Sequence, residues 1–318
     1  MDNRLAIGVD LGGSHVSAGV VDLNAEIISR AEKDIKKGKG HKGIILEDIY
    51  GVIQSSIDMI GDRAKNIKGI GIGIPGRTDS VSGMCVFAPN LGWHNVEIVS
   101  ILKTKTDLPV TILNDVRAMA AGEKMFGNGK NVDNFVSIAM GTGIGGGIVL
   151  NGTLFLGSDE GAGEIGHITI EPDGPVCGCG NKGCVEALAS GPAIVQRASK
   201  LLDKYPQSEL CNEKFLSPKI IYDAASRGDK LSLKIWHDTG IYLGRAIAAL
   251  ATSINPRRIL FSGKVSRAMD FFLPSLKQEL KMRARMVPTE KIEFMNSRFE
   301  DDAGIIGNAA RVFELFAL

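Results

Sequence analysis

Four residues that commonly bind metal ions lie close together near the middle of the chain. Cys177, Cys179 and Cys184 fall within eight positions, and His167 lies ten residues before the first of them, on a predicted strand. Three thiolates and one imidazole suit tetrahedral Zn²⁺, and four protein ligands would make the site a closed, structural one. The alternative is a set of free thiols or a redox pair, and the residues alone leave it open.

Two carboxylates bracket this zinc knuckle, defined as residues 167–184. Glu164 lies three residues before His167, and Glu186 lies two residues after Cys184. A bound zinc ion would fix both acids in space, and His167 could bind zinc through one ring nitrogen and a second partner through the other. Alternatively, both glutamates are solvated surface acids.

Glycine turns between strand-like runs occur twice. Leu11-Gly12-Gly13-Ser14 separates two runs within residues 5–22, and Gly141–Gly147, which includes Thr142 and Gly143, separates two runs within residues 135–150. Their spacing of about 130 residues indicates an internal duplication. A strand after the glycines excludes the P-loop and the Rossmann fingerprint, which need a helix there. Paired glycine hairpins could bind one polyphosphate from both sides through backbone N–H groups, whereas either turn taken alone could be an ordinary β-hairpin.

An amide and an acid follow the strand predicted over Val110–Leu113. Asn114 and Asp115 stand at its end, and a helix is predicted from Val116 to Met125. An acid at the carboxyl end of a strand lies where α/β sheets usually bind ligands. Asp115 could equally be the N-cap of the helix.

Three other turns could approach a ligand. Gly76 ends the predicted strand Ile67–Ile74, where its backbone could come close to a substrate. Asn90 lies in a loop over Pro89–Trp93, where its side chain could also merely cap or pack. Gly263 follows a predicted strand at Arg258–Phe261, and its turn either contacts a nucleoside or simply joins the strand to a helix.

Composition limits the class of protein. A chain of 318 residues with 44% hydrophobic and 23% charged residues suits a two-domain globular protein. The net charge of +1 gives no general attraction to nucleic acid or membrane surfaces, so we expect neither as a partner. Five cysteines, three of them clustered, favour a reducing, cytoplasmic setting, and no signal peptide is expected. The uncharged segment 135–158 is long enough to span a bilayer, but its seven glycines favour buried strands.

Helices are predicted over Ile44–Ile60, Ile194–Leu202, Ile220–Ala225, Leu231–Ile254 and Ala303–Phe316. Together with the strands, they predict an α/β fold.

This set of motifs resembles the ROK family of sugar kinases and sugar-responsive repressors, within the actin-like ATPase superfamily. The resemblance covers nearly the whole chain and rests on Asp10–Ser14, Asn114-Asp115, Gly141–Gly147, Glu164-Ile-Gly-His167 and Cys177–Glu186. The last two motifs in this order are highly specific.

The resemblance implies a duplicated actin-like (ribonuclease H-like) α/β fold, with ATP and Mg²⁺ in a cleft between two lobes. The expected N-terminal lobe is 1–117, to which the C-terminal helix 303–318 returns. The expected C-terminal lobe is 118–302 and contains the zinc knuckle.

It also implies roles for individual residues. Asp115 matches the general base that takes a proton from a sugar hydroxyl, usually that on carbon 6, and Asp10 would stand near Mg²⁺. Residues assigned to the nucleotide are Asp10, Gly12, Gly13, Ser14, Thr142, Gly143 and Gly263. Residues assigned to the sugar are Gly76, Asn90, Asn114, Asp115, Glu164, His167 and Glu186.

The expected activity is ATP-dependent phosphorylation of a hexose, with glucose 6-phosphate as the favoured product. N-acetylglucosamine, N-acetylmannosamine, mannose, allose and fructose stay open as substrates. A sugar-sensing repressor of the family would carry a helix-turn-helix before the first glycine turn, for which no room is expected before Asp10. A polymerising or chaperone-like ATPase would have no use for the knuckle. The family suggests a homodimer or homotetramer.

Overall fold

The computed structural model describes residues 3–35 and 42–316. Contacts between Cα atoms divide the chain into two compact units. The first spans Met1–Asp133, Gly147–Gly163 and Ser297–Leu318, and the second spans Asn134–Gly146 and Glu164–Asn296. The lobe limits expected from the sequence, with a boundary after residue 117, stay a prediction.

A five-stranded mixed sheet forms the centre of the first unit, in the order β3-β2-β1-β4-β8. Its strands are β1 (Leu5–Leu11), β2 (His15–Asp22), β3 (Ile27–Asp34), β4 (Ile67–Ile74) and β8 (Val110–Asn114). The pairs β1–β2 and β2–β3 are antiparallel, whereas β4 runs parallel to both β1 and β8. The carboxyl ends of β1, β4 and β8 therefore lie at one edge of this sheet.

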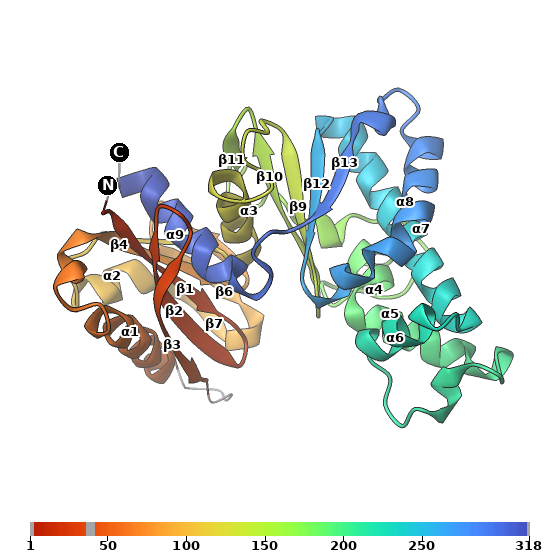
Figure 1. Ribbon diagram of the computed structural model, residues 1–318, viewed down its shortest axis with the longest axis horizontal. Helices are drawn as coiled ribbons and strands as arrows, with labels where there is room; N and C mark the ends of the chain where they lie inside the picture. The colour runs from red at the N-terminus through yellow and green to blue at the C-terminus, as the bar shows by residue number, and fades with distance from the viewer. Residues whose placement is uncertain (1–2, 36–41, 317–318) are drawn as a thin grey trace. The chain divides into compact units, whose positions relative to one another are not determined.

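Helices cover both faces of this sheet (Figure 1). On one face lie α1 (Lys42–Asp58) and α2 (Ile98–Lys103), and on the other lie α9 (Ala303–Phe316) and α3 (Asp115–Met125). The run Ile70–Ile74 alternates isoleucine with glycine, because its isoleucines enter the core with α1 while its glycines meet α9. The C-terminal helix predicted over Ala303–Phe316 is confirmed.

A small antiparallel sheet in the first unit was not predicted. It consists of β5 (Arg77–Asp79), β6 (Met84–Ala88) and β7 (Trp93–Glu97). The predicted loop over Pro89–Trp93 is wrong at both ends, because Pro89–Leu91 is a turn of 3₁₀ helix and Trp93 begins β7 with its side chain buried. Strands this short carry too little pattern to be recognised from sequence.

The second sheet has the order β11-β10-β9-β12-β13. Its strands are β9 (Phe135–Met140), β10 (Ile144–Leu150), β11 (Thr153–Phe155), β12 (Arg258–Ser262) and β13 (Glu293–Asn296), and the division between the units falls within β10. Strand by strand, the order repeats that of the first sheet, with a glycine turn between its first two strands in the chain. The predicted duplication is confirmed.

Helices of the second unit gather around one long helix. These helices are α4 (Val185–Ala189), α5 (Gly191–Leu201), α6 (Pro218–Ser226), α7 (Lys230–Ile254) and α8 (Met269–Arg283). The 25-residue α7 contacts each of the others. Phe261 of β12 meets Phe272 of α8 edge to face at 5.5 Å between ring centroids, and this contact packs α8 against the sheet.

The described part of the chain also contains eight short 3₁₀ helices: Gly61–Asn66, Pro89–Leu91, Ile165–His167, Leu202–Lys204, Glu209–Asn212, Lys264–Ala268, Thr289–Lys291 and Glu300–Asp302.

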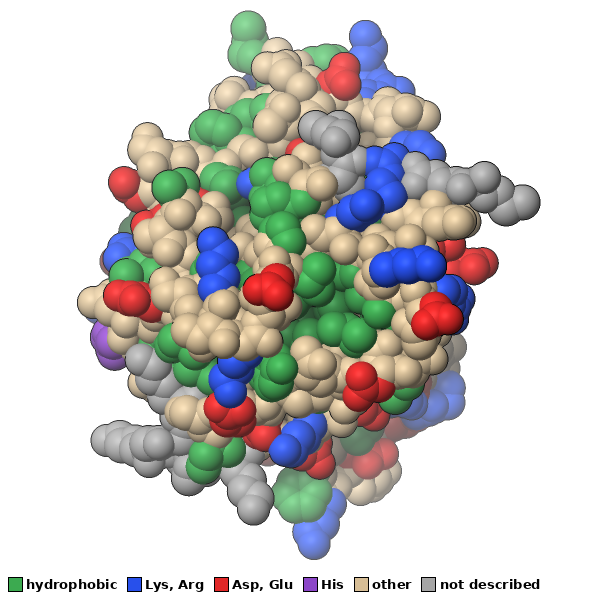
Figure 2. Space-filling model, turned by 90° about the vertical axis from the view of Figure 1, so that its left-hand side faces the viewer, with side chains coloured by type: hydrophobic (Ala, Val, Ile, Leu, Met, Phe, Trp, Pro, Cys, Tyr) green, Lys and Arg blue, Asp and Glu red, His purple; other side chains and the backbone are tan. Residues whose placement is uncertain are grey.

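No helix among residues 3–35 and 42–316 is both long and apolar enough to cross a membrane. The uncharged segment 135–158 forms strands, as its glycines predicted. Figure 2 shows basic and acidic side chains interspersed on one face, in keeping with the balanced composition.

Candidate active site and metal centre

The first unit places Asn114 and Asp115 at the junction of β8 and α3. Asn114 is the N-cap, because its Oδ1 accepts hydrogen bonds from the N–H groups of Val116 at 3.1 Å and Arg117 at 3.2 Å. The alternative that Asp115 is the N-cap is therefore wrong. Asp115 is the first residue of the helix, and its Oδ1 accepts from the Val116 N–H at 2.9 Å.

Asp115 has the acid–base character that a general base needs. Burial, reinforced by the negative charge of Asp10, raises the pKa of Asp115 to about 7. Burial also raises the pKa of Asp10, which lies on β1 at the same edge of the sheet. Since a base works best with a pKa near the working pH, Asp115 can accept a proton at neutrality.

Gly76 and the first glycine turn lie at the same sheet edge, whereas Asn90 lies outside the five-stranded sheet. The Asn114 Nδ2 donates to the Gly76 carbonyl at 3.0 Å, which ties the ends of β8 and β4 together. Asn90 is exposed in the 3₁₀ helix Pro89–Leu91. In the first glycine turn, the Gly12 N–H donates to the His15 carbonyl at 2.9 Å and closes the hairpin. Gly13 and Ser14 follow within that turn.

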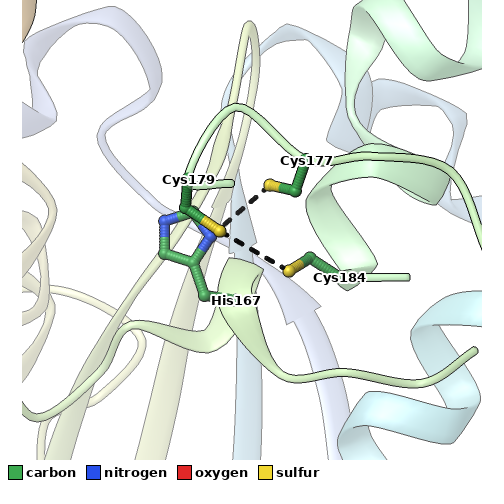
Figure 3. Close-up of side chains that lie close together, drawn as sticks. All are labelled: His167, Cys177, Cys179 and Cys184. Carbon is green, nitrogen blue, oxygen red and sulfur yellow. Dashed lines mark hydrogen bonds between the residues drawn. The ribbon is translucent and has the colours of Figure 1, made fainter. Parts of the chain in front are cut away.

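The four predicted zinc ligands of the second unit converge (Figure 3). Their ligand atoms all lie within 4.8 Å of one another, with 3.8 Å between Cys177 Sγ and His167 Nδ1 and 3.8 Å between the Sγ atoms of Cys179 and Cys184. A tetrahedral zinc ion with bonds of about 2.3 Å to sulfur separates its ligands by about 3.8 Å. The arrangement therefore fits zinc. His167 ends a 3₁₀ helix, so its predicted place on a strand is wrong.

Backbone contacts close the knuckle. The Cys177 N–H donates to the Asn181 carbonyl at 2.7 Å, and the Gly180 N–H donates to the Cys177 carbonyl at 2.9 Å. Gly183 has φ +67°, and a Cβ there would lie 1.5 Å from the Glu171 carbonyl oxygen, so only glycine fits. Burial raises the pKa of Cys184 to about 12, so a cation is needed to hold this sulfur as a thiolate.

Glu186 joins the knuckle to the second glycine turn. Its Oε2 accepts from the Ile144 N–H at 2.9 Å, and its Oε1 lies 3.7 Å from Cys177 Sγ. Glu164 is exposed at the start of the His167 helix, and Thr142 is exposed on the turn. The contact between Glu186 and the turn was not predicted, since nothing in the sequence pairs residues 42 positions apart.

Two further residues of the first unit were not among the predicted site residues. Glu160 is buried with φ +52° and accepts from the Ser80 N–H at 3.0 Å and from the Ser80 hydroxyl. The Nε of Arg117, buried on α3, donates to the Ala162 carbonyl at 2.8 Å. Both fix the segment that leads to Glu164. Arg117 could have been suspected from its place two residues after Asp115, whereas Glu160 carries no signal.

Each unit carries part of the predicted set of residues on a duplicated α/β fold, and comparison with known proteins identifies the family. A model of the ROK family matches residues 6–314. The chain belongs to the ROK family, as its motifs predicted.

Curated relatives fall into two groups. Glucokinases from Thermotoga maritima and Halalkalibacterium halodurans are 35% and 34% identical. The alignments cover 97% of this chain and 97% of the first enzyme, and 96% of this chain and 94% of the second. A xylose repressor from Caldicellulosiruptor bescii is 32% identical, over 96% of this chain and 77% of the repressor.

Solved structures show the same division. A ROK family glucokinase from Streptomyces griseus, in complex with glucose and AMPPNP, is 29% identical with a TM-score of 0.80, covering 96% of this chain and 98% of that chain. A ROK family transcriptional regulator, a homologue of the E. coli MLC protein, is 30% identical with a TM-score of 0.91, covering 98% of this chain and 78% of that chain.

Proposed function

We infer that the protein is an ATP-dependent sugar kinase that converts glucose to glucose 6-phosphate. Glucokinases 34–35% identical over nearly the whole chain support this activity. The observation that carries it is Asp115, a carboxyl group at the end of a strand with its pKa raised to about 7. A sugar sensor needs no general base, whereas a kinase does.

In the proposed reaction, Asp115 accepts the proton of the sugar hydroxyl on carbon 6 as that oxygen attacks the γ-phosphorus. The new oxygen–phosphorus bond forms while the bond to the β,γ-bridging oxygen breaks, and ADP leaves with that electron pair. Phosphoryl transfer depends mainly on positioning and charge neutralisation, so one base and suitable binding groups suffice.

Residues of both units would bind the two substrates. For the sugar we propose Gly76, Asn90, Asn114, Glu164, His167 and Glu186, whose amides and carboxylates would pair with its hydroxyl groups. For the nucleotide we propose Asp10, Gly12, Gly13, Ser14, Thr142, Gly143 and Gly263. Asp10 would stand near Mg²⁺, whose charge would offset the burial that raises the pKa of this carboxyl.

Zinc would be bound by His167, Cys177, Cys179 and Cys184. With four protein ligands, its contribution would be structural: it cross-links the segments that precede and follow the knuckle.

The test is ADP release from MgATP with a panel containing glucose, mannose, allose, fructose, N-acetylglucosamine and N-acetylmannosamine. We expect the fastest release with glucose. Fastest release with another sugar would keep the kinase and change its substrate.

Similarity to the xylose repressor and to the MLC homologue favours a sugar-sensing regulator as the second candidate. A protein that binds glucose and MgATP without releasing ADP would be a sensor.

A further inference from the structure

The second glycine turn is held by segments that carry the proposed sugar and zinc residues. The Gly191 N–H, just after α4, donates to the Gly141 carbonyl at 2.9 Å. Gly166, between Glu164 and His167, lies so close that a Cβ there would be 2.0 Å from the Ile144 carbonyl oxygen. These contacts lie within the second unit and leave the turn little freedom to move independently.

Glu186 also contacts the second glycine turn, and unlike Gly191 and Gly166 it does so through a charged side chain. Its Oε2 accepts from the Ile144 N–H at 2.9 Å, a charge-assisted hydrogen bond to the end of the turn. A Cβ added to Gly143 would lie only 2.5 Å from the same oxygen, so the carboxylate packs directly against the turn. Its other oxygen faces the knuckle, 3.7 Å from Cys177 Sγ.

We propose that Glu186 is a positioning residue for the nucleotide, in addition to any contact with the sugar. By holding the Ile144 N–H, its carboxylate sets the shape of the Gly141–Ile144 turn that receives the polyphosphate of a nucleoside triphosphate. The affinity for MgATP therefore depends on this carboxylate even when no sugar is present. The inference rests on the proposed function, which places Thr142 and Gly143 at the phosphates.

The test is MgATP binding to the sugar-free protein, measured by calorimetry. Glu186→Ala removes a charge-assisted hydrogen bond and should weaken MgATP binding by about tenfold or more. Glu186→Gln keeps an oxygen that can accept from the Ile144 N–H, so it should stay within about threefold of wild type.

The matched control is Glu164→Gln, which changes the other proposed sugar carboxylate of this unit. It should lower glucose affinity and leave MgATP affinity unchanged. Equal losses of MgATP affinity in Glu164→Gln and Glu186→Ala would overturn the positioning role, because a general disturbance of the unit would then explain both.

A second variant keeps the inference testable if Glu186→Ala folds poorly. Gly143→Ala places a methyl group against Oε2 and should lower both MgATP affinity and the melting temperature. Because the Glu186 carboxyl supplies every atom near that methyl position, the same change should cost little stability in the Glu186→Ala background. Additive effects on melting temperature would contradict the contact.

Failures of the two claims are distinguishable. Wild-type protein that binds MgATP but phosphorylates no sugar overturns the proposed kinase and leaves the positioning test intact. Unchanged MgATP affinity in Glu186→Ala overturns only the positioning role. Wild-type protein without affinity for MgATP overturns both.

Discussion

Asp115 in the first unit and Glu186 in the second both stand in the first turn of a helix, but different interactions hold them. The N-cap before Asp115 is Asn114, whose amide oxygen binds two backbone N–H groups of α3. The N-cap before Glu186 is Cys184, which makes no side-chain cap hydrogen bond and belongs to the cluster of three cysteines and one histidine. One helix start is fixed by hydrogen bonds to the backbone, and the other would be fixed by the zinc ion that we propose for this cluster.

The two ways of holding a carboxylate match the two functions that we propose for Asp115 and Glu186, a base and a binding group. Asp115 directly follows β8, the last strand in the order of its sheet, and burial together with a second acid raises its pKa into the range useful for proton transfer. Glu186 lies on the short helix α4, beside the second glycine turn and the knuckle, and a bound zinc ion would hold the start of this helix in place. The proposed base thus obtains its chemistry from burial beside the sheet, whereas the proposed binding group would depend on the cluster that precedes its helix.

The largest expected effect is that of Asp115→Asn. This change removes the base and should lower kcat for ADP release by about 10²- to 10⁴-fold, the usual contribution of general-base catalysis. Glucose affinity, measured by calorimetry, should stay within about threefold, because the Asn114 cap and its bond to Gly76 are untouched. Retained turnover would remove Asp115 from the chemistry.

Breaking the metal centre should affect binding more than catalysis. Cys184→Ser should abolish stoichiometric zinc and weaken glucose binding by about 10- to 100-fold, since Glu186 and His167 lose their support. Metal analysis and calorimetry measure both effects. The matched control is Cys211→Ser, which changes an exposed cysteine outside the cluster and should alter neither. Normal glucose affinity in zinc-free Cys184→Ser would refute the constraint.

The pH dependence of kcat/KM tests whether the ionisation of Asp115 controls the reaction. As Asp115 must be ionised to act, kcat/KM for glucose should rise with pH, by about tenfold per unit below its pKa of about 7, and level off above it. A profile flat between pH 5 and 8 would contradict this.

The free energy of unfolding should change with pH in the opposite direction to kcat/KM. The folded protein holds the Asp115 proton up to about pH 7, whereas the unfolded chain releases it near 3.8, so the free energy of unfolding falls as pH rises between these values. Asp115→Asn should remove that fall and be more stable than wild type at pH 8, by at most about 4 kcal/mol. Denaturant titrations of both proteins at pH 4 and 8 measure the difference.

The smallest effect is expected in the first glycine turn. Ser14 is exposed, and Ser14→Thr keeps the hydroxyl and adds one methyl group, so KM for ATP should change by less than about twofold. Ser14→Ala is the matched comparison, because it removes the hydroxyl. Equal KM values in all three proteins would show that this hydroxyl does not contact the phosphates.

Local patterns made much of this architecture predictable. Both glycine hairpins, the helix from residue 303 and the convergence of the zinc ligands follow from short motifs or regular spacing. The small β5–β7 sheet could not be predicted, because its strands have only three to five residues and gain stability from packing around Trp93.

Contacts between segments far apart in the chain could not be predicted from local patterns either. The bond from Ile144 to Glu186 and the burial of Glu160 against Ser80 depend on segments brought together only by the fold. The sequence had suggested only Asp115 as a possible N-cap, whereas the cap is Asn114; both residue types favour capping, and only the backbone geometry decides between them.

Glucose-dependent ADP release from MgATP, measured side by side for wild type and Asp115→Asn at pH 7.5, tests most directly whether the protein is a kinase that uses Asp115 as its base. We expect rapid release by wild type and almost none by the variant, with glucose bound by both. Binding of glucose without ADP release by wild-type protein would contradict this expectation and identify a sugar sensor.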